Sequence, residues 1–262
     1  MLSHTEWSSR QQEHEARADE LTAAHRDRAR RGEKHPVWDF LFSYYSYKPA
    51  TLRRWHPGAG ITLEGAPERV SWRWYSPGEV ADSVVPDAEA FAADKGSLAN
   101  LIERMLRRTA AQPAQFGCFG LHEWAMVYRE SEHRHAAPLR LGQDGTDAVV
   151  ETHELRCTHF DAYRFFTPEA TPRNRLPLSR EEQPMHEQPG CLHAGMDVYK
   201  WAVKLGPLVP GDLLLDAFEL ARDIRLLDMR AAPYDLSDWG VVPVPIETPE
   251  GKAEYVRRQR AF

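Results

Sequence analysis

The sequence predicts a mainly helical α+β fold: a single domain with a small antiparallel sheet. Two patterns lead to this prediction. Long segments carry apolar residues at helical spacing, and a few short runs are rich in β-branched and aromatic residues, so we expect the sheet in the middle third. The chain has 262 residues, of which 42% are hydrophobic, which is enough for a full core.

The N-terminal segment, residues 1–34, is predicted to be a charged helix or arm. Acidic and basic side chains alternate in it and large apolar side chains are almost absent, as in a solvated helix or frayed arm. Residues 35–262 contain no internal repeat and no convincing linker. We therefore expect them to form a single globular catalytic domain.

The next part of the chain is dense in aromatic residues, and Pro36 favours the start of a helix there. Two runs, 60–64 and 69–75, consist largely of β-branched and aromatic residues and are predicted strands. Residues 86–110 carry apolar side chains at helical spacing and are predicted to form a helix.

The segment 117–129 is apolar enough to be buried, but its periodicity does not distinguish a helix from a strand. Strands are predicted at 138–141 and 148–160, joined by the turn-rich sequence GQDGTD. In the second of these strands, Cys157, His159 and Asp161 would share one face.

The proline-rich stretch 168–190 has no regular period and is a candidate lid or site-lining loop. Two helices are predicted after it, at about 190–205 and 211–229. The C-terminal arm, 231–262, is expected to be extended and to end in a short basic helix.

Composition excludes several classes of protein. The net charge of −6 disfavours DNA as a partner, because the whole molecule would repel a phosphate backbone. Three cysteines do not suggest a disulfide framework, and no signal peptide or long apolar run is present. We therefore expect a cytoplasmic protein that does not enter a membrane.

Each of the three cysteines has a histidine and a carboxylate within a few residues. Thiol, imidazole and carboxylate groups carry out proton transfer, nucleophilic attack and metal binding, so this pattern favours an enzyme. The clusters are Cys118–His122–Glu123, Cys157–His159–Asp161 and Cys191–His193–Asp197.

The candidate catalytic residues come from these clusters. Glu123 lies among apolar residues, which would raise its pKa as a general acid or base requires. His193 and Asp197 are four residues apart, so they project from one face of a helix, where the carboxylate can orient the imidazole. His159 and Asp161 complete the set. For the Glu123 motif and the His159/Asp161 motif, a hydrogen-bonded core network is about as common as a catalytic role. For His193 and Asp197 the alternative is an exposed pair that contributes little to stability.

A bound metal is not required by this pattern, because the ligand spacing typical of structural zinc is missing. We expect no cofactor. If a catalytic metal is present, Glu123, His159, Asp161 and His193 could assemble an iron or manganese site. The cysteines are more commonly buried and inert than nucleophilic.

Charged residues are also interleaved with the apolar residues of the helix at 211–229, where an ion-pair ladder is the simpler explanation and a carboxylate-lined pocket the functional one. Elsewhere, Arg53, Arg54, Trp55 and His56 combine anion donors with an aromatic surface. The candidate residues for binding an anionic substrate are Arg53, Arg54, Arg164, Lys200, Arg230 and Tyr234.

Five segments resemble a largely uncharacterised bacterial family whose members are often named 3-methyladenine DNA glycosylase. They are HPVWDFLFSYYSYKPATLRRWHPG, CFGLHEWAMVYR, CTHFDAYRFFTP, MDVYKWA and LDMRAAPYDL, and the resemblance covers roughly residues 35–262. It implies a base-excision activity on a flipped base. The hairpin of a helix-hairpin-helix glycosylase is matched in outline by KLGPLVPGD, which leads to Asp216 or Asp223.

We expect a soluble enzyme that uses buried carboxylate and histidine groups for acid–base chemistry on a small or nucleotide-like substrate. C–N bond cleavage fits this chemistry, and so does substitution or elimination with ring closure in a secondary-metabolite pathway. Two alternatives are a DNA base-excision glycosylase of the 3-methyladenine type and a non-catalytic subunit of a hetero-complex. The aromatic segment 38–56 would provide a homo- or hetero-oligomeric interface.

Overall fold

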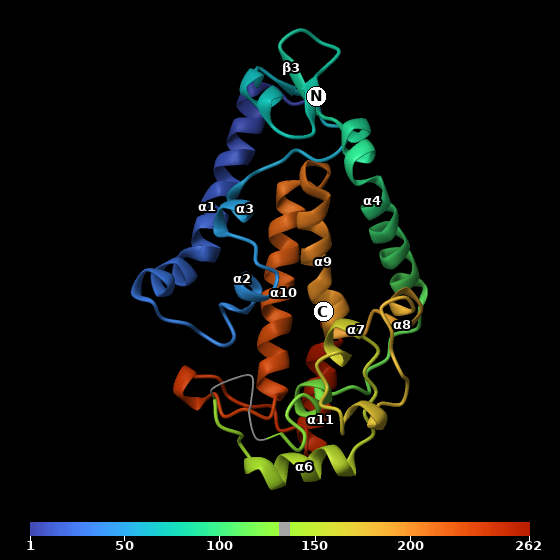
Figure 1. Ribbon diagram of the computed structural model, residues 1–262. Coiled ribbons are helices and arrows are strands. Elements are labelled where there is room, and N and C mark those ends of the chain that lie inside the picture. Colours follow the sequence, from blue (N-terminus) through green and yellow to red (C-terminus); the bar gives the residue numbers. More distant parts are fainter. Residues whose placement is uncertain (131–136) are drawn as a thin grey trace. The chain divides into compact units, whose positions relative to one another are not determined.

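The computed structural model describes residues 1–130 and 137–262 of the chain. The described residues contain eleven α-helices, four 3₁₀ helices and one sheet of three short antiparallel strands (Figure 1). The predicted class, mainly helical α+β with a small antiparallel sheet, is confirmed. The chain forms two compact units. Unit 1 comprises Met1–Glu103 and Val198–Ala221, and unit 2 comprises Arg104–Asp197 and Arg222–Phe262.

Unit 1 begins with a long charged helix, α1 (His4–Arg31). A capping box of Ser3 and Glu6 starts this helix, and Gly32, with φ 70°, ends it. One stripe of α1 is buried although the segment has few large apolar residues, because Trp7 packs against a small apolar cluster that includes Trp55. Two short helices follow, α2 (Phe40–Tyr44) and α3 (Pro49–Arg53).

The sheet belongs to unit 1 and has the strand order β1-β3-β2. Its strands are β1 (Leu63–Glu64), β2 (Tyr75–Pro77) and β3 (Ser83–Pro86). The prediction of a sheet in the middle third of the chain is therefore wrong. Most of the predicted strand 69–75 is the 3₁₀ helix η1 (Pro67–Ser71) and a turn. The local preference of these residues for a strand yields to the burial of Arg69 among tryptophan rings.

Three long helices match the predicted helical patterns. They are α4 (Ala88–Ala111), which is kinked at Lys95, α9 (Leu192–Leu205) and α10 (Gly211–Ala231). The 3₁₀ helix η3 (Gly206–Leu208) lies between the last two. Each of these three helices, α4, α9 and α10, contributes residues to both units.

Unit 2 is built from shorter helices and loops. The predicted strands at 138–141 and 148–160 are wrong: 138–141 contains only an isolated β-bridge at Leu139 and a turn, and Gly142–Thr152 forms helix α6. Burial explains the difference: Val149 and Val150 lie on a buried helix face, so tertiary packing overrides their strand preference. The other elements are α5 (Leu121–Ala125), α7 (Phe160–Tyr163), η2 (Thr171–Arg173), α8 (Gln183–His186), η4 (Ser237–Trp239) and α11 (Pro249–Gln259).

Within the described ranges, no helix combines the length and the apolar character that crossing a membrane would require.

Asp39 joins the end of α1 to the start of α2, and we predict that it makes unit 1 sensitive to acid. Burial opposes ionisation of this carboxyl group, but hydrogen bonds from Arg28, His25 and the backbone N–H of His35 outweigh burial and lower its pKa to about 2. A lowered carboxyl pKa stabilises the fold above the unfolded-state pKa, and this contribution is lost as the pH falls from about 4 to about 2. Asp39→Asn should lower the free energy of unfolding at pH 7 by about 1–2 kcal/mol.

Urea unfolding at pH 7 and at pH 3 measures this effect. The gap in stability between wild type and Asp39→Asn should narrow at the lower pH. A gap of equal size at both pH values would contradict the role given to the carboxylate charge.

We predict that the stability of unit 1 depends on the planar guanidinium group of Arg69 and not only on its charge. Its side chain is 1% exposed, and its guanidinium carbon lies 4.9, 5.1 and 4.7 Å from the ring centroids of Trp7, Trp55 and Trp72. Arg69→Lys keeps the charge but loses the planar group that stacks on these rings, so we expect a loss of about 1–3 kcal/mol. Chemical unfolding followed by tryptophan fluorescence measures it. A loss below about 0.5 kcal/mol, as at an ordinary surface site, would contradict this role.

Candidate functional site

A buried group of histidine and carboxylate side chains lies in unit 2. It draws on α5, the residue before α7, the residue after α8, and the parts of α9 and α10 that belong to this unit. Every member except His193 is at most 4% exposed. We call it the His/carboxylate cluster: His122, Glu123, His159, Glu187, His193, Asp197, Arg225 and Asp228.

Helix α5 is set in place by a glycine. Gly120 has φ 75°, and a Cβ atom there would lie only 3.2 Å from the Cβ of Ala231, so a larger residue would be strained and crowded. The indole N–H of Trp124 also donates to the carbonyl of Ala231, at 2.8 Å. These contacts hold α5 against the end of α10 and bring His122 and Glu123 to the residues of that helix.

The first triad of the cluster consists of His122, His193 and Asp228. The Nε2 atom of His122 lies 2.8 Å from Oδ1 of Asp228. The rings of His122 and His193 meet edge to face, with centroids 4.4 Å apart. One potential ligand atom from each of the three residues lies within 4.8 Å of the other two.

The second triad consists of His159, Glu187 and Asp197. The Nε2 atom of His159 lies 3.2 Å from Oε1 of Glu187 and 3.3 Å from Oδ2 of Asp197. Its ligand atoms are also within 4.8 Å of one another. The ring centroids of His159 and His193 are 5.3 Å apart, so His193 connects the two triads.

Arg225 anchors the first triad. Its Nη1 donates to Oε1 of Glu123 at 2.8 Å and to Oδ2 of Asp228 at 2.6 Å, and its side chain is 1% exposed. Asp228 therefore binds Arg225 through one oxygen and His122 through the other. Within the cluster, four carboxylates accompany this single guanidinium, an arrangement that attracts positive charge.

The electrostatics of the first triad follow from these contacts. Burial opposes a charge on His122, but the negative charge and hydrogen bond of Asp228 outweigh burial and hold its pKa well above the usual value. Burial and the neighbouring His122 and His159 lower the pKa of His193. Burial opposes the charge of Asp228, but His122 and Arg225 lower its pKa below its ordinary range. At neutral pH the triad thus contains a protonated His122, a neutral His193 and an ionised Asp228.

The three cysteines lie around one small cavity beside this cluster. The cavity offers about 10 Å³ to the centre of a water-sized sphere, which is room for about one water molecule. Burial raises the pKa of Cys191 to about 12 and that of Cys157 well above its ordinary value, so both remain thiols at neutral pH. The polar lining consists of Cys118, His122, Cys157, Thr158, Gln188, Cys191, His193, Tyr255 and Gln259.

Four predicted catalytic residues lie in the cluster: Glu123, His159, His193 and Asp197. Glu123 belongs to neither triad and pairs with Arg225. Asp161 is not a member of either triad. Its carboxylate binds Arg180 at 2.7 Å and Arg164 at 3.2 Å. Arg164, a predicted anion-binding residue, is therefore paired with a carboxylate of the chain itself.

The other predicted anion-binding residues do not converge on one site. Arg53, Arg54 and Lys200 belong to unit 1, and Arg53 is held by Glu15 and Asp19. In unit 2, Arg230 donates a hydrogen bond to the carbonyl of Val242. Tyr234 is buried, and its backbone forms an isolated β-bridge with Leu139.

Sequence reasoning missed four members of the cluster as site residues: His122, Glu187, Arg225 and Asp228. His122 stands beside Glu123 in a Cys–His–carboxylate motif, and Asp228 and Arg225 stand among the apolar residues of α10, so each gave a signal. The sequence contains no signal for Glu187 except its position in the stretch 168–190, the predicted site-lining loop. Part of this stretch does line the site.

The two aspartates that the glycosylase resemblance indicates are exposed. Asp216 is 61% exposed and pairs with Arg17, and Asp223 is 54% exposed and pairs with Arg222. The aromatic segment 38–56 contributes rings to the interior of unit 1, where Tyr45 and Tyr47 pack edge to face against Tyr199.

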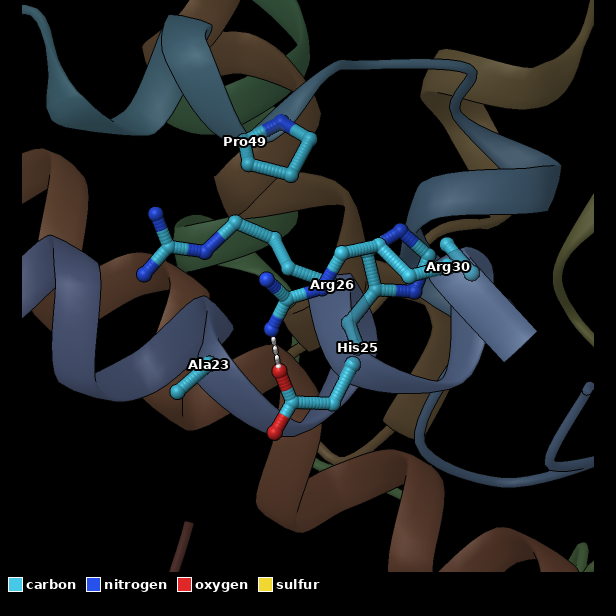
Figure 2. A pocket seen from close by; sticks show the side chains of 7 residues that line it. Ala23, His25, Arg26, Arg30 and Pro49 are labelled. Atoms are coloured by element: carbon cyan, nitrogen blue, oxygen red, sulfur yellow. Dashed lines mark hydrogen bonds and ion pairs between the residues drawn. The ribbon is translucent and has the colours of Figure 1, made fainter.

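A shallow hollow of about 560 Å³ lies along α1, next to Pro49 (Figure 2). Its charged side chains satisfy one another or their neighbours: Arg30 folds back to Asp27, Arg26 binds Asp19, and His25 binds Asp39. We assign no binding role to it.

Comparison of the chain with family models, with curated proteins and with solved structures gives no match in any of the three. The resemblance to the glycosylase-named family therefore stays a prediction.

Proposed function

We propose that the chain is a metal-dependent enzyme whose active centre is the His/carboxylate cluster of unit 2. The observation that carries the proposal is the pair of adjoining buried triads, each with three potential ligand atoms within 4.8 Å of one another. Two ligands bound about 2.1 Å from one ion, at right angles to each other, are about 3 Å apart. The N···O separations of 2.8, 3.2 and 3.3 Å in the triads match this value.

The donor atoms favour iron or manganese. Two histidines with one carboxylate form the ligand set typical of non-haem iron, and one histidine with two carboxylates suits iron or manganese. Four carboxylates in a buried cluster with the guanidinium of Arg225 and the imidazolium of His122 also favour the binding of a further cation, because burying excess negative charge is costly. A bound ion would supply Lewis-acid or redox chemistry.

The adjacent cavity bears on the class of reaction. A space of about 10 Å³ admits about one water molecule but not the reacting part of a large substrate. We therefore favour activation of such a small molecule at the cluster. Retention of iron would favour oxidation, and retention of zinc would favour hydrolysis.

A metal-free acid–base enzyme is the second candidate. The direct contacts of His122 with Asp228 and of His159 with Asp197 favour it, because a carboxylate at this distance orients an imidazole for proton transfer. The substrate would be small or nucleotide-like, as we expect from the sequence. Metal content distinguishes the two candidates.

We predict that the purified full chain retains iron or manganese near stoichiometry, and that Asp228→Asn and Asp197→Asn each lower the retained amount at least several-fold. Each change replaces a charged ligand by a neutral amide in one triad. The metal content is measured by elemental analysis of protein that is purified from cells grown with iron, manganese and zinc.

Asp161→Asn is the matched control, because Asp161 is another buried carboxylate of unit 2 but belongs to neither triad. Its metal content should equal that of the wild type. Metal-free wild-type protein after growth with all three metals would contradict the proposal and favour the acid–base enzyme.

We also predict that chelation lowers the midpoint of thermal unfolding. An ion present at a thousand times its dissociation constant stabilises the folded state by about 4 kcal/mol, which corresponds to a shift on the order of 10 °C for a chain of this size. Differential scanning fluorimetry with and without a chelator measures the shift. The double variant Asp197→Asn/Asp228→Asn should show almost none, and an equal shift in that variant would place the stabilising ion elsewhere.

A further inference from the structure

Unit 1 contains a second pocket, separate in composition from the His/carboxylate cluster. Its volume is about 330 Å³, at the lower end of the range for small-molecule sites. Every residue that lines it belongs to unit 1. The polar and aromatic lining residues are Lys48, Thr51, Arg54, His56, Trp72, Arg73 and Trp74.

The charge of this lining is positive. Lys48, Arg54 and Arg73 line the pocket, and none of its lining residues is an acid. Arg73 is paired with Asp94. Among the described residues, neither Lys48 nor Arg54 takes part in an ion pair, so both charges are available to an anion.

Arg54 is held in position without being neutralised. Its guanidinium carbon lies 5.3 Å from the ring centroid of Trp72, so the group stacks on the indole while its N–H groups remain free to donate. Its neighbour Arg53 differs, because Glu15 and Asp19 bind it on the surface. Arg53 is thus neutralised by acids of the chain, whereas Arg54 keeps its charge for a ligand. The sequence motif alone does not distinguish the two arginines.

The aromatic wall of the pocket is fixed by the contacts of Trp74, which has an unusual backbone conformation. Trp74 has φ 61°, a left-handed conformation that is unusual for a bulky residue. Its indole N–H donates to Asp94 at 3.0 Å, and its ring packs on Phe91. Gly206 lies beneath the ring, where a Cβ atom would approach it to 3.3 Å. Trp72 and Trp74 therefore present two fixed rings to the pocket.

His56 adds a neutral polar group. Burial and the nearby Arg69 and Arg54 lower its pKa to about 3, so the imidazole is uncharged at neutral pH. Its Nδ1 pairs with the hydroxyl of Tyr75 at 2.8 Å. When the tyrosine donates this hydrogen bond, Nε2 carries the ring proton and is a donor for an anion.

We propose that this pocket binds a planar aromatic molecule that carries a phosphate group, of the size of a nucleoside monophosphate. Arg54 and Lys48 bind the phosphate, and the tryptophan rings contact the planar group. The volume excludes a much larger ligand, and the two indoles distinguish the pocket from a site for inorganic phosphate alone. The proposal does not depend on the metal centre, because no residue is shared between the two sites.

Titration of the full chain with adenosine 5′-monophosphate tests the proposal, with calorimetry and tryptophan fluorescence as readouts. Binding should weaken at least tenfold in Arg54→Ala, whereas Arg53→Ala should bind within twofold of the wild type. The two arginines are adjacent, are both exposed and carry the same charge, so Arg53→Ala controls for net charge and for general effects on the fold. Lys48→Ala gives a second, independent test and should also weaken binding.

Adenosine and inorganic phosphate are the matched probes. Each should bind at least tenfold more weakly than the monophosphate. Equal binding of adenosine would overturn the role of the phosphate, and equal binding of inorganic phosphate would overturn the role of the aromatic wall. No binding of the monophosphate at millimolar concentration, or equal losses in Arg53→Ala and Arg54→Ala, would overturn the proposal as a whole.

Discussion

The buried ion pairs of Arg225 are the interaction on which the His/carboxylate cluster depends. A guanidinium that is 1% exposed is tolerable only with close partners, and Glu123 and Asp228 provide them at 2.8 and 2.6 Å. Because Arg225 occupies one oxygen of Asp228, the other is directed to His122. The same contacts join α5 to α10, two elements about a hundred residues apart in the sequence.

The second triad has the opposite balance of charge. His159 lies between Glu187 and Asp197, so two carboxylates share one imidazole. A buried carboxylate pair is stable with a proton or a metal ion between the groups, which is why such a site suits either proton transfer or metal binding. Burial raises the pKa values of the Cys157 and Cys191 thiols, so these two residues line the cavity beside His122 and His193 without adding negative charge.

In unit 1, a buried charge is stabilised by aromatic rings and not by buried carboxylates. Arg69 lies among three indole rings, whose faces attract a cation without a buried carboxylate. The same combination of arginine and tryptophan continues to Arg54 on Trp72, where the cation remains available. The cluster in unit 2 thus gathers carboxylates and histidines, whereas the surroundings of Arg69 and Arg54 in unit 1 gather cations and aromatic rings.

The sequence by itself determined the long helices and part of the site. Helical spacing marked the regions of α4, α9 and α10, and the four-residue interval between His193 and Asp197 placed both on one face of α9, because these patterns are local. Only the tertiary structure decided the short elements: Val149 and Val150 became helical through burial, and 69–75 became a 3₁₀ helix and a turn around Arg69. The tertiary structure also decided which carboxylates pair with which histidines. Glu187 and Asp228 join histidines 28 and 106 residues away, and a choice among distant partners depends on packing that no local pattern records.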